Sequence, residues 1–204
     1  MLLSDALSLV CGEACLQISQ TVAQATQPLR IVPGKIKEQG LATWLVHNTH
    51  MFTLIKAGET TLAFCHGNNM LFYAKPEFML HRGVPDGHSF LAQLAEDKEQ
   101  GVIVPRLLVM DLITPRNEDP CARNQIVRNL SSFFPPSCVL QWAGQVDALR
   151  AFLKNGLPHE VGGIVALGSP LHLTKEVRVE LPVNVLQRVV EDREEQGNLK
   201  RARA

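Results

Sequence analysis

The stretch LATWLVHNTHMFTLIKAGETTLAFCHGNNMLFYA, residues 41–74, decides the fold. Gly58-Glu59 and Gly67-Asn68-Asn69 interrupt it and are typical of the tight turns of β-hairpins. The apolar runs between these and other polar segments have strand length. They predict successive strands at Leu41–Val46, Met51–Lys56, Thr60–His66 and Met70–Ala74.

On both sides of this meander the pattern alternates between helix and strand. Before it, apolar residues recur at helical spacing from Leu3 to Val22, and Arg30–Gly40 is typical of a connector. After it we expect a pair of strands at His88–Asp97 and Arg106–Ile113, separated by a polar tip at Asp97–Gly101. Helices and strands then follow in turn: a helix at Cys121–Phe133, a strand at Val139–Trp142, a helix at Val146–Asn155, a buried strand at Val161–Leu167 and a helix at Pro182–Gln196.

This order of elements favours an α+β fold, an antiparallel-rich sheet with packed helices. We expect an N-terminal helix and connector at 1–40, one main domain at 41–182, and a C-terminal helix and basic tail at 183–204. The strands should share one continuous core. Its largely buried residues should include Leu54, Leu62, Phe64, Leu108, Met110, Ile164 and Ala166.

Composition excludes several classes of protein. Lys+Arg and Asp+Glu are both 20, so any contact with RNA must come from a local patch. Five scattered cysteines indicate reduced buried thiols rather than a zinc site or disulfides, which favours a cytoplasmic or nuclear protein. No apolar stretch is long enough to cross a membrane, and Asp5 and Glu13 interrupt the N-terminal one, so we expect neither a membrane partner nor a leader.

Motifs for phosphate loops, dinucleotide binding, zinc hydrolysis and serine hydrolysis are absent from the sequence, and no cofactor is expected. His47 and His50 lie three residues apart, but no nearby Cys or carboxylate would complete a metal site. Trp44 and Trp142 are the two tryptophans, and each is either a core residue or a surface on which a base stacks.

Read together, the strands resemble the cap-binding domain of the snurportin family. The Trp44–Phe64 run, with Gly58-Glu59-Thr60-Thr61 inside it, is similar to that family's opening strands. The paired runs Phe90–Glu96 and Pro105–Ile113, and then Leu157–Ala166, follow in the same order. The resemblance covers about residues 41 to 182. It implies the nucleotidyltransferase-like fold of capping enzymes and nucleic-acid ligases.

The motifs of the enzymes among these relatives are not matched. Lys56 lies near the position of their nucleophilic lysine, but Ala-Gly-Glu follows it instead of x-Asp-Gly. Leu94 and Gly162 stand where the enzymes have metal-holding carboxylates. Glu96 and Glu160 lie two residues away, and a two-residue slip keeps the strand face, so a divergent nucleotidyltransferase remains an alternative.

The resemblance therefore implies a non-catalytic binding protein for capped RNA or a nucleotide. It implies a pocket lined by Trp44, Lys56, Thr60 and Lys75, in which an indole covers the base and ammonium groups meet phosphate. Val179 stands where the family has a second stacking tryptophan, which predicts weak binding with little preference for methylated guanine. The other alternative is a protein-interaction module that has lost the nucleotide and uses its terminal helices.

Overall fold

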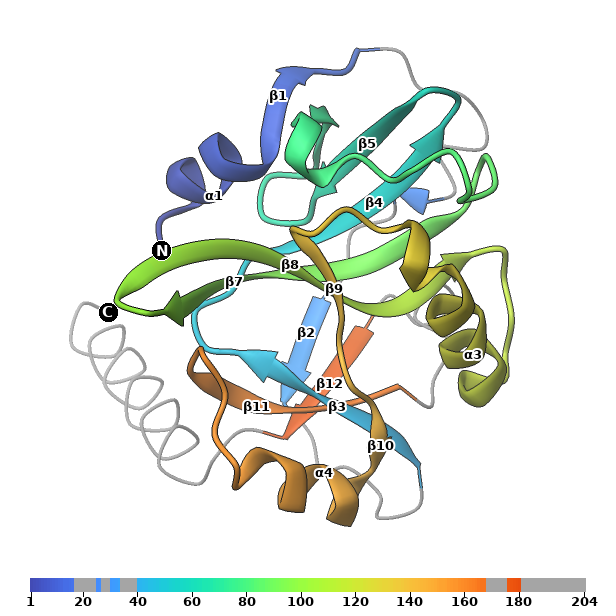
Figure 1. The fold of residues 1–204 in the computed structure, drawn as a ribbon. Coiled ribbons are helices and arrows are strands. Elements are labelled where there is room, and N and C mark those ends of the chain that lie inside the picture. The colour runs from blue at the N-terminus through green and yellow to red at the C-terminus, as the bar shows by residue number, and fades with distance from the viewer. Residues whose placement is uncertain (17–24, 27–29, 34–39, 168–175, 181–204) are drawn as a thin grey trace, which may run out of the picture.

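The computed structural model describes residues 1–16, 25–26, 30–33, 40–167 and 176–180 (Figure 1). Its larger sheet has the strand order β1-β6-β5-β4-β7-β8-β9. All neighbours in this sheet are antiparallel except β8 and β9. The strands are β1 Cys11–Ala14, β4 Met51–Ala57, β5 Thr60–Cys65, β6 Met70–Ala74, β7 Ser89–Glu99, β8 Val102–Thr114 and β9 Cys138–Leu140.

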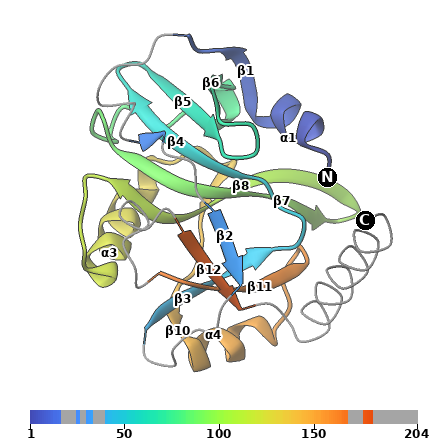
Figure 2. The ribbon, with the colours of Figure 1, turned by 180° about the vertical axis from the view of Figure 1, so that it is seen from behind.

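The smaller sheet has the strand order β10-β3-β11-β12-β2. It is antiparallel apart from the β12–β2 pair. Its strands are β2 Arg30–Pro33, β3 Leu41–Val46, β10 Gly144–Gln145, β11 Val161–Ala166 and β12 Glu176–Glu180. Figures 1 and 2 show this sheet lying against one side of the larger one, crossed relative to it.

Helices cover the opposite face of the larger sheet. Residues Ala6 and Val10 of α1 (Leu3–Val10) and Val127 of α3 (Pro120–Leu130) pack in one apolar cluster with Phe52 and Phe90 of the sheet. Helix α4 (Val146–Leu153) packs beside β3. Short 3₁₀ turns lie at Pro76–Phe78 (η1) and Ser131–Phe133 (η2). No helix in the described part of the chain is long and apolar enough to span a membrane.

The two sheets are joined by apolar contacts and by buried amides. Leu91 and Met110 of the larger sheet pack against Leu45 and Val165 of the smaller one. Gln93 of β7 is fully buried, and its amide donates to the Trp44 carbonyl at 2.9 Å and accepts from the Val46 amide at 2.8 Å. Because these bonds satisfy polar groups in a dry interior, they fix where β3 crosses β7.

A buried ion pair also holds the C-terminal end of β11. The Arg123 side chain of α3 contacts Asp111 of β8 at 2.9 Å and donates to the backbone carbonyls of Asn117 and Leu167. Burial raises the pKa of the Asp111 carboxyl, and Arg123 opposes that shift. Arg123 therefore connects α3, β8 and β11.

The α+β architecture, with its large and mostly antiparallel sheet, agrees with the expectation from sequence. All four predicted strands are confirmed. The first, β3, joins the smaller sheet, and β4, β5 and β6 form the meander, with positive φ angles at Gly58 and Asn69 in its turns. The β7–β8 hairpin extends farther than predicted, and its turn is confined to Gln100 and Gly101. Of the seven predicted core residues, only Ile164 and Ala166 are half-buried rather than buried.

Two predictions at the N-terminal end need correction. The helix ends at Val10 rather than continuing toward Val22, because Cys11–Ala14 pairs with β6 as the edge strand of the larger sheet. The predicted connector contains strand β2, which pairs with β12. The predicted helix at Pro182–Gln196 lies outside the described residues. All five cysteines are free thiols, and only Cys121 is exposed.

Candidate functional site

Trp44 of β3 is enclosed in the structure. Its side chain is 4% exposed and stacks on Phe152 and on the His159 ring. Its indole N–H donates to Nε2 of His159 at 2.9 Å. Neither the face nor the N–H of this indole is available to a ligand in this arrangement.

Lys56 of β4 is also buried, at 4% exposure. Its ammonium donates to the Leu80 carbonyl at 3.1 Å, and the Leu80 amide donates to the hydroxyl of Thr61 at 2.8 Å. Lys56 and Thr61 are cross-strand partners, so their side chains point to the same face of the sheet and hold Leu80 between them. This lysine has a structural role as an anchor for the segment after η1.

The other two residues of the predicted pocket point elsewhere. Thr60 precedes Thr61 on β5, so its side chain faces the side of the sheet opposite to Lys56. Lys75 follows β6, and its ammonium donates to the Ser8 carbonyl of α1. Lys56, Thr60 and Lys75 are therefore near one end of the β4–β5–β6 meander but face different surroundings, and Trp44 is on the other sheet.

A cavity lies instead where β7 extends beyond its neighbour β4. The β3–β4 loop attaches to β7 at Leu94, whose amide donates to the His50 carbonyl at 3.0 Å and whose carbonyl accepts from the Thr49 hydroxyl at 2.8 Å. The α4–β11 loop attaches four residues farther along, where the Lys98 amide donates to the Pro158 carbonyl at 3.0 Å. The two loops therefore stand as walls on either side of Glu96.

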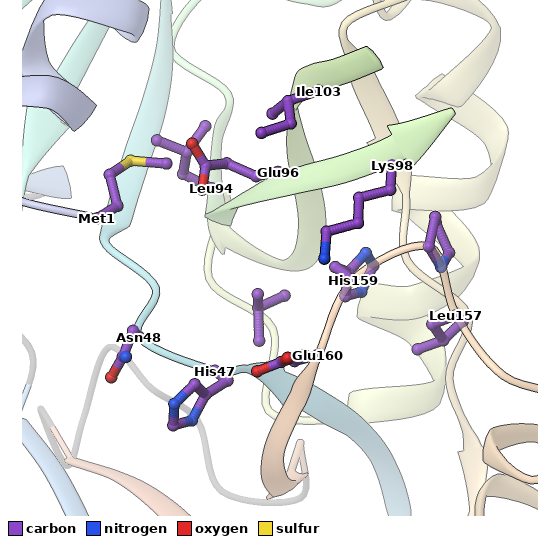
Figure 3. Close-up of a pocket in the computed structure, with 12 residues that line it drawn as sticks. Met1, His47, Asn48, Leu94, Glu96, Lys98, Ile103, Leu157, His159 and Glu160 are labelled. Carbon is purple, nitrogen blue, oxygen red and sulfur yellow. The ribbon is translucent and has the colours of Figure 1, made fainter. Parts of the chain in front are cut away.

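We call this space, about 340 Å³ in volume, the β7 cavity. Figure 3 shows the ammonium of Lys98 directed into it, with Glu96 and Glu160 on different walls. Its lining combines apolar and polar side chains: Met1, Val46, His47, Asn48, Leu94, Glu96, Lys98, Ile103, Leu157, Pro158, His159 and Glu160. Such a mixture of apolar walls and a few converging polar groups is typical of a ligand site, and the volume is at the small end of the range for such sites.

Three charged side chains of the cavity have no ion-pair partner within the described part of the chain. These are Glu96, Lys98 and Glu160, all exposed. By contrast, the neighbouring acids Asp97 and Glu99 on β7 are both paired with Arg106 of β8, at 3.3 and 2.6 Å. The charges that face the cavity are thus the ones left available to a ligand.

The wall carrying His159 is rigidly held. An indole N–H only donates, so Nε2 of His159 must accept from Trp44, and the proton of the neutral ring lies on Nδ1. Nδ1 lies 2.6 Å from Oδ1 of Asp97 and donates to it. With both nitrogens bonded, His159 positions the loop and does not serve as a free base.

Gly162 allows the opposite wall to close. A bulge in the β3–β11 pairing falls at this residue, and a Cβ there would lie 3.1 Å from Cα of His47. The adjacent amide of His47 donates to the Glu160 carbonyl at 2.8 Å. The glycine thus lets His47 and Glu160 meet at the rim of the cavity.

The described residues contain no group of three or more His, Cys, Asp or Glu side chains that could hold a metal. His47 lines the cavity, whereas Nε2 of His50 lies 3.1 Å from the Met1 carbonyl. The two histidines therefore have different environments.

The sequence did not show that Trp44 and Lys56 are buried, but it came closer for the residues that line the β7 cavity. Hydrophobic runs do not reveal whether a tryptophan or lysine within them points to solvent, so Trp44 and Lys56 could not be recognised as buried. Glu96 and Glu160 drew attention only as near matches to enzyme motifs, yet both line the β7 cavity. One sequence signal could have identified Lys98 as a cavity residue. It lies two positions from Glu96 on a strand, so both side chains are on one face.

No protein-family model matches the chain, and no curated protein matches it in sequence.

Proposed function

We propose that this protein is a non-catalytic binding protein that holds a nucleotide, free or at the capped end of an RNA, in the β7 cavity. The observation that carries the proposal is a set of charges of both signs, Glu96, Lys98 and Glu160, around one small space, none with an ion-pair partner among the described residues. A nucleotide combines N–H donors on its base with negative phosphate. Carboxylates accept from the former, and an ammonium binds the latter.

The resemblance to the snurportin cap-binding domain supports the same class of ligand. A methylated guanine carries positive charge, so a capped end presents a cation and phosphates together. The carboxylates and the ammonium of the cavity have the complementary charges. Val179, on β12 opposite Val165, remains the position at which the resemblance predicts a missing stacking ring, so we expect weak binding with little preference for methylation.

Two observations argue against nucleotidyl transfer through Lys56. Its ammonium is buried and donates to Leu80, and Lys56 does not line the cavity that contains Glu96 and Glu160. A lysine nucleophile has to meet the nucleotide and its metal-holding acids at one place. Binding without covalent chemistry is the better-supported activity.

The test is calorimetric titration of the wild type and two lysine variants with GMP, GTP and a methylated cap analogue. Lys98→Ala should weaken binding by about tenfold to a hundredfold, because a charge-assisted hydrogen bond contributes about 1.5–3 kcal/mol. Lys154→Ala, at the exposed end of α4, is the matched control and should bind like the wild type. Equal affinities for the two variants, or no binding by the wild type, would overturn the proposal.

A protein-interaction module is the second candidate. Val102 and Ile103, at the tip of the β7–β8 hairpin, are 63% and 57% exposed, and apolar side chains at such a tip suit a protein contact. The enclosure of Trp44 also fits a fold that has lost base stacking. If the nucleotide screen is negative for every ligand at millimolar concentration, this candidate replaces the first.

A further inference from the structure

Between the two loop attachments at Leu94 and Lys98, the backbone of β7 is open toward the β7 cavity at Glu96. The last pair between β7 and β4 is Gln93 with Met51, so from Leu94 onward this edge of β7 has no strand beside it. The amides of Leu94 and Lys98 both donate on this side, to His50 and Pro158. Both groups therefore point away from β8.

Glu96 lies midway between these two residues, without any shift in the β7–β8 register. Amide and carbonyl groups of residues two apart point to the same edge of a strand, so those of Glu96 also point away from β8 and toward the cavity. Its partner on β8 is Pro105, which has no backbone N–H to donate. No described residue pairs with the Glu96 backbone on the cavity side.

The opening is wide enough for a planar group but too narrow for an added strand. Leu94 and Lys98 are about 13 Å apart along an extended chain. A peptide that adds to a sheet edge bonds to every second residue, and here both flanking residues already have loop partners. Glu96 offers one backbone donor and one backbone acceptor side by side. The hydrogen-bonding edge of a nucleobase likewise has a donor next to an acceptor.

We propose that the backbone N–H and C=O of Glu96 bind the hydrogen-bonding edge of the nucleobase while Lys98 holds the phosphate. The inference rests on the proposed nucleotide-binding function and adds the group that distinguishes a base-bearing ligand from a sugar phosphate. Leu157 and Ile103, in the same lining, provide apolar surface for the faces of the ring.

The test compares GMP with ribose 5-phosphate, which has the phosphate but no base. Glu96→Pro and Glu96→Ala both remove the carboxylate, but only the first removes the amide. Since that amide points away from β8, proline breaks no ladder bond. We expect Glu96→Pro to bind GMP about three- to tenfold more weakly than Glu96→Ala, with ribose 5-phosphate unaffected.

An amide-to-ester replacement at Glu96, which keeps the side chain, provides a second measurement if the proline variant fails to fold. It should weaken GMP binding by a similar factor. If the ester and proline changes leave GMP affinity unaltered while Lys98→Ala reduces it, the reading of the base by Glu96 is wrong and the nucleotide site stands.

If wild-type protein binds neither GMP nor ribose 5-phosphate, the proposed function itself fails. If an extended lysine-containing tripeptide binds instead and loses affinity in the ester variant, the open edge serves a peptide, and the inference is overturned.

Discussion

At the scale of single residues, strand β7 carries two kinds of polar side chain. Some are bonded within the fold, and others have no partner among the described residues. On β7, Asp97 is bonded to His159 and to Arg106, whereas Glu96 and Lys98, its immediate neighbours, face the β7 cavity without partners in the described chain. Alternation of side chains along a strand produces this division. At this end of β7, one face is bonded within the fold and the other presents charges without ion-pair partners among the described residues.

The Trp44–His159 bond should be measurable as a coupling energy. His159→Phe leaves the buried indole N–H without an acceptor, which should lower the free energy of unfolding by about 1–3 kcal/mol. Trp44→Phe combined with His159→Phe should cost less than the sum of the single changes, because no donor is then left unsatisfied. Urea denaturation of the four proteins gives the coupling. Strict additivity would show that the bond does not form.

At the scale of elements, the position of the cavity depends on the β3–β11 bulge and on the loops that follow β3 and α4. Gly162 sits at this bulge, under His47. The two strands end beside each other, so each supplies one rim residue, His47 and Glu160. A change that separates the strands should therefore deform the cavity.

Gly162→Ala should reduce both stability and nucleotide affinity. Its Cβ would lie 3.1 Å from Cα of His47, a backbone atom that can move only if β3 moves. Overpacking of this kind costs about 1–3 kcal/mol. Gly40→Ala is the control, since a Cβ there meets nothing within 4 Å. Thermal unfolding and GMP titration of both variants provide the measurement, and equal behaviour would refute the role given to Gly162.

The elements themselves were largely predictable because their patterns are local. Apolar runs bounded by Gly58 and by Gly67-Asn68-Asn69 give the meander without tertiary information. Strand β1 was missed because its pairing with β6 is a contact between distant parts of the chain that outweighs the helical spacing of Leu3–Val22. The same limit applies to the site, since the approach of Glu96 to Glu160 depends on how two loops attach to β7.

At the scale of the whole molecule, the fold partly buries polar residues whose ionisation affects stability. His66 is an example, with its Nε2 2.8 Å from the Thr53 hydroxyl and its pKa lowered by burial from 6.5 to about 4. Between these values the unfolded chain takes up a proton that the folded chain does not. The contribution of His66 to stability is therefore complete above pH 6.5 and is lost as the pH falls to about 4.

This titration predicts a specific pH dependence. The free energy of unfolding should fall by about 3 kcal/mol more between pH 7 and pH 4 in the wild type than in His66→Gln, which has no proton to take up. Denaturation curves at several pH values measure the difference. Parallel pH profiles for the two proteins would contradict the burial of a neutral His66.

The protein should also fail to catalyse nucleotidyl transfer. With Lys56 anchored to Leu80 and apart from the cavity acids, radiolabelled GTP or ATP with magnesium or manganese should leave no covalent label. Gel electrophoresis after denaturation detects such a label. A phosphoamide adduct that disappears in Lys56→Ala would reinstate the catalytic alternative.

The most direct test of the central claim is a map of backbone amide NMR shifts during titration with GMP. Binding in the β7 cavity predicts the largest changes at Glu96 and Lys98 of β7 and in the two flanking loops, at His47–Asn48 and His159–Glu160. Changes centred instead on Lys56, Thr60 and Lys75, or no changes at saturating GMP, would contradict the account.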